Sequence, residues 1–175
     1  TDTLSGFTVR TLSNNSIVWK NTGADRNKVK GWVIDLDVPE AGGGSVEYPG
    51  ERAIRNFQKR GDFVFVNTVL PRSSDSCETG PGGYELGFDP NTGGSGTTTI
   101  FETNSDEAFT ALDNVGLTSG SGVVSAIRFD DATPSDSTFL GNRRMTQLSD
   151  QTVRSISTNT GETSGVGRYS WREIN

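Results

Sequence analysis

The sequence predicts an all-β protein built from antiparallel sheets. Glycine is very frequent, with 22 among 175 residues, while only 31% of the residues are hydrophobic. Short runs of β-branched and aromatic residues alternate with Gly, Pro, Asn and Asp, and helical periodicity is almost absent. Because 175 residues can bury a sizeable core, we expect one all-β domain over residues 1–175.

The first half of the chain contains most of the predicted strands. Residues 7–20 suggest a hairpin around the Asn14-Asn15 pair, and residues 31–38 suggest a strand with alternating apolar side chains. The next predicted strands are residues 53–57, 63–70 and 84–88, with Gly61 in a turn between the first two and a turn over residues 89–93. Phe63 to Val66 is continuously apolar, which predicts burial on both faces of a sheet.

The second half is richer in Gly, Ser and Thr and is harder to interpret. Residues 123–129 predict a clear strand, and residues 107–112 at most a turn or two of helix. Shorter strand candidates follow at residues 139–140, 143–148, 152–156 and 169–174. Strand pairs spaced in this way suggest four-stranded antiparallel sheets, as in propeller blades.

Composition and charge argue against several function classes. The net charge is −6, with a pI near 4.7 and no basic patch, so no nucleic-acid partner is expected. The chain has no histidine, which removes Ser-His-Asp triads and His-ligated metals. The carboxylates Asp35, Asp37, Glu40 and Glu51 lie near one another in the sequence but are read as solvated, so we expect no enzyme activity.

Export is the expected context. No apolar run is long enough to span a bilayer, and no leader segment is recognisable, so any signal peptide has been removed or lies upstream. The single Cys77 pairs either with a cysteine elsewhere in a longer chain or remains a free, partly buried thiol.

The order of motifs between Lys30 and Gly94 is distinctive. KGWVIDLD leads to GER at residues 50–52, then to FVFVNTVLP, SSDSC and GFDPNTGG, and the chain closes with GRYSWREIN at residues 167–175. This order resembles the carboxy-terminal domain of the PilC/PilY-type tip adhesins of type IV pili. The resemblance implies a modified β-propeller. At about 40–45 residues per blade, the chain would hold at most about four blades, either the last part of a longer propeller or a compact relative.

The same resemblance implies a function. It points to a non-enzymatic secreted module that supports pilus assembly and surface adhesion at the pilus tip. Minor pilins or a tip complex, and host or abiotic surfaces, would be its partners, and it would reach the cell surface through the periplasm. Two alternatives stay open: a structural surface or filament subunit that kept the fold without tip adhesion or calcium control, and a calcium-dependent sugar-binding or hydrolytic domain.

An acidic loop is the candidate metal site. Calcium loops place oxygen ligands at alternating positions and close the shell at the twelfth. Counting from Glu102, such a loop would use Glu102, Asn104, Asp106, the Ala108 carbonyl and Asp113. The resembled family carries an F-D-x-N-x-D-G loop at this place, so calcium is the implied cofactor. Here the first ligand is Glu, and Glu107 replaces the turn glycine.

Two further features have competing interpretations. Arg60-Gly61-Asp62 spells the tripeptide that integrins bind on exposed turns, but a plain hairpin turn with a solvated charge pair is the simpler interpretation. Trp19, Trp32 and Trp171 lie within predicted strands, where core packing is expected and an aromatic platform for a sugar is the alternative.

Overall fold

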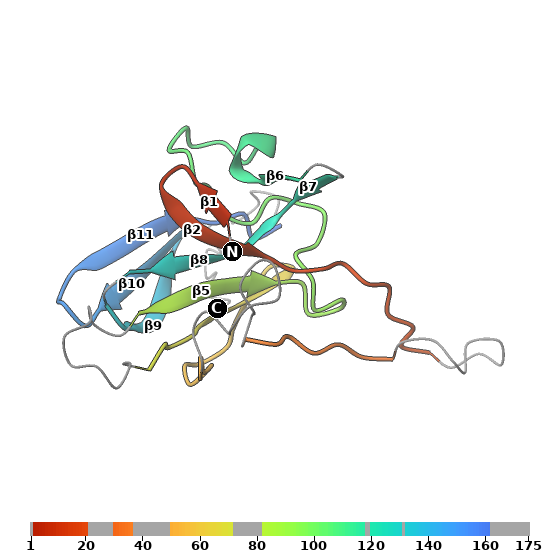
Figure 1. Ribbon diagram of the computed structural model, residues 1–175, viewed down its shortest axis with the longest axis horizontal. Helices are drawn as coiled ribbons and strands as arrows, with labels where there is room; N and C mark the ends of the chain where they lie inside the picture. The colour runs from red at the N-terminus through yellow and green to blue at the C-terminus, as the bar shows by residue number, and fades with distance from the viewer. Residues whose placement is uncertain are drawn as a thin grey trace, which may run out of the picture.

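The computed structural model is an all-β molecule with antiparallel sheets, which confirms the predicted class (Figure 1). Cys77 and the segment 167–175 fall outside the residues that the structure describes. No helix in the described part of the chain is long and apolar enough to cross a membrane. The described residues are 2–20, 30–36, 50–71, 82–117, 120–130 and 132–161.

The largest sheet has six strands, and every neighbouring pair in it is antiparallel. The hairpin β1–β2 forms one end and the hairpin β3–β4 the other, with β8 and β5 between them. In order across the sheet, the strands are β1 (Asp2–Leu4), β2 (Phe7–Thr11), β8 (Val124–Phe129), β5 (Gly83–Phe88), β4 (Phe63–Asn67) and β3 (Gln58–Arg60).

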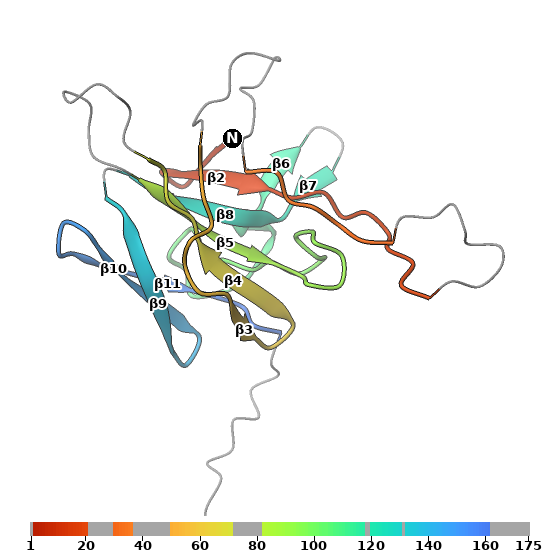
Figure 2. The same cartoon turned by 90° about the horizontal axis from the view of Figure 1, so that it is seen from below.

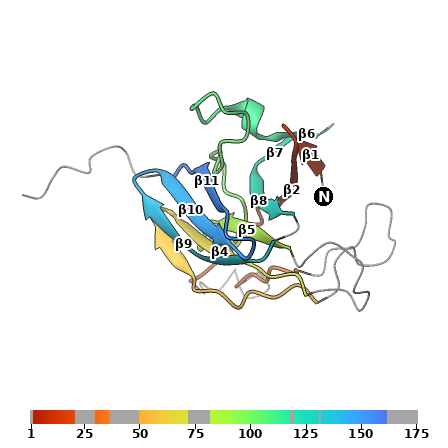
Figure 3. The same cartoon turned by 90° about the vertical axis from the view of Figure 1, so that its left-hand side faces the viewer.

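A three-stranded sheet lies against one face of the large sheet, next to β4 and β5 (Figures 2 and 3). It consists of β9 (Pro134–Leu140), β10 (Arg143–Leu148) and β11 (Val153–Ser157), with β10 in the centre. A small ribbon of β6 (Val115–Leu117) and β7 (Gly120–Gly122) completes the strands. The prediction of four-stranded sheets is therefore wrong for the described residues, because β5 and β8 join two hairpins into one continuous sheet.

The six-stranded sheet is buried on both of its faces. Its inner face, which we define as the face toward β9–β11, contributes Phe65 and Ile127 to a core that also contains Phe101 and Ile156. Its outer face carries a second core: Val66, Tyr84, Leu86, Phe88 and Ala126, against which Ile34 and Leu36 pack. This arrangement explains why the segment Phe63–Val66 is continuously apolar and confirms its predicted burial.

The first hairpin forms earlier in the chain than predicted. Its turn is Ser5-Gly6, whose φ angles of 50° and 85° suit a tight two-residue turn. The predicted turn at Asn14-Asn15 is wrong. The Asn14 side chain instead donates to the Gly96 carbonyl at 2.6 Å and accepts from the Gly96 amide at 2.8 Å, so it ties an extended segment to another loop.

Two predicted strands do not form. Residues 30–36 make no ladder, because their apolar side chains cover the outer face of the sheet instead of pairing at its edge. Residues 53–57 are likewise not a strand, and β3 begins only at Gln58. That segment is held to β9 by side chains: the Asn56 amide donates to Asp136 at 2.7 Å, and Arg55 Nε donates to the Pro134 carbonyl at 3.0 Å.

The remaining predictions from the second half agree better with the structure. The strands at 123–129 and 143–148 are confirmed as β8 and β10, and the candidates at 139–140 and 152–156 fall in β9 and β11. The candidate at 169–174 lies outside the described residues. The predicted helical turn at 107–112 shrinks to a 3₁₀ turn at Ala111–Asp113, capped by Thr110.

Candidate functional sites

The acidic loop after Phe101 folds around its own backbone. The Asp106 amide donates to Glu102 Oε1 at 3.2 Å and to Asn104 Oδ1 at 3.1 Å, and Asp106 Oδ1 accepts from the Ala108 amide at 2.8 Å. Glu107 has a φ of 62°, the left-handed conformation that the glycine of a calcium loop normally supplies. The loop therefore forms a turn lined by side-chain oxygens, with Glu107 at the position where a calcium loop has glycine.

The twelfth position of the loop does not fit a calcium shell. Asp113 is 0% exposed, and its Oδ1 accepts from the Thr103 amide at 2.7 Å and the Thr103 hydroxyl at 3.1 Å. Its Oδ2 accepts from the Thr110 amide at 3.0 Å, which closes a capping box. Because both carboxylate oxygens hold the backbone, Asp113 serves the fold.

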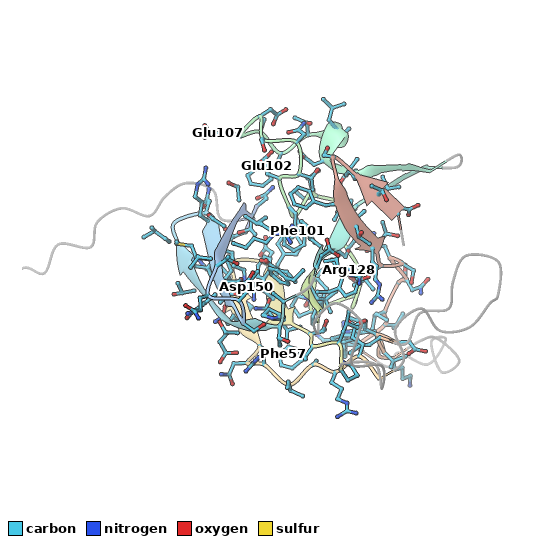
Figure 4. All side chains as sticks on the ribbon, turned by 60° about the vertical axis from the view of Figure 1, so that its left-hand side comes forward. Phe57, Phe101, Glu102, Glu107, Arg128 and Asp150 are labelled. Carbon is cyan, nitrogen blue, oxygen red and sulfur yellow. The ribbon has the colours of Figure 1, made fainter. Side chains whose placement is uncertain are left out.

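The loop runs from the core to the surface of the molecule. Figure 4 shows Glu102 and Glu107 at the periphery of the molecule, while Phe101 lies between the sheets. Glu107 reaches Arg143 at 3.6 Å in an exposed ion pair. Among the described residues, no group of three or more acidic, cysteine or histidine side chains is gathered closely enough to hold a metal ion. Of the predicted ligands, the side chains of Glu102, Asn104 and Asp106 share the hydrogen bonds of this loop, and the Ala108 carbonyl stays a predicted ligand.

The Arg60-Gly61-Asp62 triplet is the tight turn between β3 and β4. The guanidinium of Arg60 lies 5.8 Å from the centre of the Phe139 ring, so this side chain turns toward the three-stranded sheet. The exposed Asp62 donates its backbone amide to the Thr160 carbonyl at 2.9 Å. The predicted hairpin geometry is therefore present, and integrin binding remains a prediction.

Two buried ion pairs were missed by the sequence analysis. On the inner face, Arg144 Nη1 donates to Glu85 Oε1 at 3.0 Å, and both side chains are 1% exposed. On the outer face, Arg10 Nη1 donates to Glu51 Oε2 at 2.6 Å. The interpretation of Glu51 as a solvated carboxylate is wrong, because the Arg10 guanidinium and the Thr68 hydroxyl bind it inside the protein.

Burial dominates the electrostatics of the inner pair. Loss of solvation raises the pKa of Glu85, and the nearby Arg144 and Arg154 guanidinium groups only partly oppose this rise. The same burial lowers the pKa of Arg144. The arginine also lies 5.3 Å from the Phe65 ring centre and 5.7 Å from that of Phe139, so aromatic faces surround its charge. The sequence signal for this pair was Glu85, a charged residue within the otherwise apolar strand β5.

Two tryptophans lie on the surface instead of in the core. Trp19 is 60% exposed, so the prediction that it packs in the core is wrong. Trp32 is 40% exposed, so only part of its ring is covered by the protein. The Trp32 ring packs edge-on against Phe88 with centroids 5.2 Å apart. Trp171 falls outside the described residues.

Taken together, the fold and its candidate sites define a class: a two-sheet all-β module with an acidic surface loop and exposed aromatic side chains. Comparisons with known proteins specify it further. The chain is 32% identical over 171 residues to a type IV pilus biogenesis factor PilY1 homolog of Xylella fastidiosa, covering 98% of the chain and 12% of that protein. It is also 32% identical over 95 residues to PilY1 of Pseudomonas aeruginosa, covering 54% of the chain and 8% of that protein.

A solved structure shares the fold. The crystal structure of the Pseudomonas aeruginosa PilY1 C-terminal domain matches with a TM-score of 0.63 and 22% identity, over 89% of this chain and 28% of that one. No family model matches the sequence. The predicted resemblance is confirmed: the chain is homologous to PilY1-type proteins over nearly its whole length, and its fold is similar to that of part of the Pseudomonas aeruginosa PilY1 C-terminal domain. It spans about an eighth of the length of the Xylella relative.

Proposed function

We propose that this chain is a non-enzymatic, exported module of the type IV pilus machinery that supports pilus assembly and surface adhesion at the pilus tip. The observation that carries the proposal is the 32% identity to a pilus biogenesis factor over 98% of the chain. Minor pilins or a tip complex would be its partners, and the cell surface or pilus tip, reached through the periplasm, its location. The absence of histidine supports a non-enzymatic role.

An in-frame deletion of these residues in the host genome tests the pilus role. We expect far fewer surface pili by electron microscopy and loss of twitching motility, with recovery on complementation. The variant Val153→Glu is a matched control, because Val153 is 58% exposed on β11 and its replacement leaves both cores intact. Normal piliation in the deletion strain would reject the proposal.

The alternative function is a structural surface or filament subunit that kept the fold. The two functions differ in stoichiometry and position. A tip protein is scarce relative to the major pilin and is labelled by immunogold only at filament ends, whereas a filament subunit is abundant and labelled along the shaft. Labelling along the shaft would favour the alternative.

A further part of the proposal is that the sheets belong to a modified propeller completed by sequence beyond these 175 residues. The similarity to 28% of the solved PilY1 chain supports it. A structure of the longer protein tests this part: sheets arranged around a central axis would support it, and a free-standing two-sheet domain would reject it.

Weak calcium binding by Glu102, Asn104 and Asp106 is a second candidate function. The left-handed Glu107 and the inward-turned oxygens of the loop favour it, and calcium would supply a charged bridge between those oxygens. We expect millimolar calcium to raise the melting temperature relative to a chelator control, and Asp106→Asn to remove the shift. An unchanged melting temperature would exclude the site.

A further inference from the structure

The two extended segments 12–20 and 30–36 lie on the same side of the molecule, beyond the six-stranded sheet (Figures 1 and 2). Residues of both segments line a groove. Its volume is about 400 Å³, within the range of small-ligand sites. Asn15, Ser16 and Ile17 line it from the first segment, and Trp32 and Val33 from the second.

The Asp89–Gly94 turn makes this groove rigid. Trp32 Nε1 donates to the Pro90 carbonyl at 2.9 Å, and Trp19 Nε1 donates to the Asn91 carbonyl at 3.0 Å, so one turn holds both indoles. A Cβ added at Gly93 would lie 2.4 Å from the Trp32 ring, so the ring lies directly against the backbone. The aromatic surface is therefore fixed before any ligand binds, which lowers the entropic cost of binding.

The chemistry of the lining is neutral and mixed. No Asp, Glu, Lys or Arg is among the described residues that line this groove, although the whole chain has a net charge of −6. Trp32 and Val33, which is 88% exposed, offer apolar surface, and Asn15, Ser16 and Thr92 offer hydroxyl and amide groups. The described lining offers an ionic ligand no opposite charge, so electrostatic complementarity favours an uncharged ligand.

We propose that this groove binds a neutral carbohydrate. A sugar ring presents an apolar C–H face, which suits a fixed indole, and a rim of hydroxyls that both donate and accept hydrogen bonds, which suits amide and hydroxyl side chains. A neighbouring groove of about 560 Å³ shares Ser13 and again has no charged residue in its described lining. The two grooves together favour an oligosaccharide over a single sugar.

The carbohydrate site would explain how the module adheres to a surface, so this inference rests on the adhesion role in the proposed function. It concerns what the module binds on a surface, whereas pilus assembly does not depend on it. A strain that carries Val33→Glu should therefore keep its normal number of pili while losing attachment to surfaces that carry the sugar.

The test measures binding of the purified protein to an array of neutral and sialylated glycans, followed by titration of the bound oligosaccharide with tryptophan fluorescence. We expect saturable binding of at least one neutral glycan. Val33→Glu places a carboxylate at the groove and should weaken binding about tenfold or more. Because Val33 is so exposed, this variant should keep the wild-type melting temperature. Trp32→Ala should weaken binding about thirtyfold.

The control variant is Val153→Glu, which introduces the same charge at an exposed valine on β11, outside this lining. It should bind like the wild type. Failure to bind any neutral glycan, binding of sialylated glycans alone, or equal binding by Val33→Glu and the wild type would overturn the carbohydrate site. Capture of a pilin in a Val33-dependent manner without glycan binding would likewise reject it in favour of a protein interface. None of these outcomes alters the piliation result that tests the proposed function.

Discussion

The six-stranded sheet carries one buried ion pair on each face, and the two pairs join different parts of the molecule. On the inner face, Glu85 of β5 meets Arg144 of β10, so this pair connects the two sheets. On the outer face, Arg10 of β2 meets Glu51, which lies in the loop before β3, so that pair holds a loop to the sheet. The inner pair is 1% exposed on both sides, whereas Arg10 is 10% exposed.

The carboxylates of the two pairs are also satisfied differently. Glu51 uses both oxygens, one for Arg10 and one for the Thr68 hydroxyl at 2.6 Å, and the Arg10 guanidinium lies 3.8 Å from the Tyr84 ring centre. Glu85 accepts one hydrogen bond from a side chain in the described part of the chain, that of Arg144. The inner pair therefore depends more on its single partner, and breaking it should cost more.

The largest expected effect is that of Glu85→Leu. Leucine cannot accept a hydrogen bond from Arg144 as either form of the Glu85 carboxyl does, so the Arg144 guanidinium stays buried without this partner, and breaking such pairs costs about 3–5 kcal/mol of unfolding free energy. Chemical denaturation, monitored by tryptophan fluorescence, measures it. A loss below about 1 kcal/mol, the value of a surface ion pair, would show that the pair does not hold the sheets together.

A double variant is the control for this prediction. Glu85→Leu combined with Arg144→Met removes both charges at once and replaces them with apolar side chains. Such replacements are often neutral or stabilising, so the double variant should be clearly more stable than Glu85→Leu alone. Equal destabilisation of both variants would assign the loss to packing instead of charge.

The outer pair should give a smaller effect. Glu51→Gln keeps a side chain of the same shape that still accepts from Thr68, and the Arg10 charge retains the Tyr84 ring. We expect a loss of about 1–3 kcal/mol in the same denaturation experiment. A loss larger than that of Glu85→Leu would reverse the ranking of the two faces.

Close packing on the inner face gives a third way to test the comparison. A Cβ at Gly87 would lie 3.0 Å from the Phe65 ring and 3.1 Å from Ile100, so Gly87→Ala should cost about 1–3 kcal/mol through overpacking. Gly116→Ala is the matched control, because a Cβ there meets nothing within 4 Å, and its effect should stay within about 0.5 kcal/mol. Equal effects at both positions would show that the inner face tolerates extra volume.

Several strands were predictable because their patterns are local. The segments that became β4, β5, β8 and β10 are short runs bounded by turn residues, and burial on both faces makes the Phe63–Val66 run continuously apolar. The pairing order was not predictable, since β5 pairs with β8 across a long connection that leaves no local trace. Residues 31–36 have the alternating apolar pattern of a strand because Ile34 and Leu36 pack on the outer core. The segment nevertheless forms no β-ladder.

The candidate sites show the same limit. The spacing of the acidic residues predicted a ligand loop, but the buried role of Asp113 depends on Thr103 and Thr110 contacts that spacing does not reveal. No sequence motif marks Arg144, and only the fold places it opposite Glu85. Trp19 looked like a core anchor because a strand pattern does not distinguish a ladder from an exposed extended segment.

The smallest expected effect is a dependence of stability on pH that comes from the inner pair alone. Burial raises the pKa of Glu85 above its ordinary value of 4.5, so the native state binds this proton at a higher pH than the unfolded chain does. As the pH falls from 7 toward 4.5, the wild type should therefore gain unfolding free energy relative to the Glu85→Leu/Arg144→Met variant. The exposed Asp150, whose pKa is lowered by hydrogen bonds from Thr152, is present in both proteins and cancels in the difference. Denaturation curves at several pH values measure this difference, and a decrease toward acid would mean that the attraction of Arg144 outweighs the loss of solvation at Glu85.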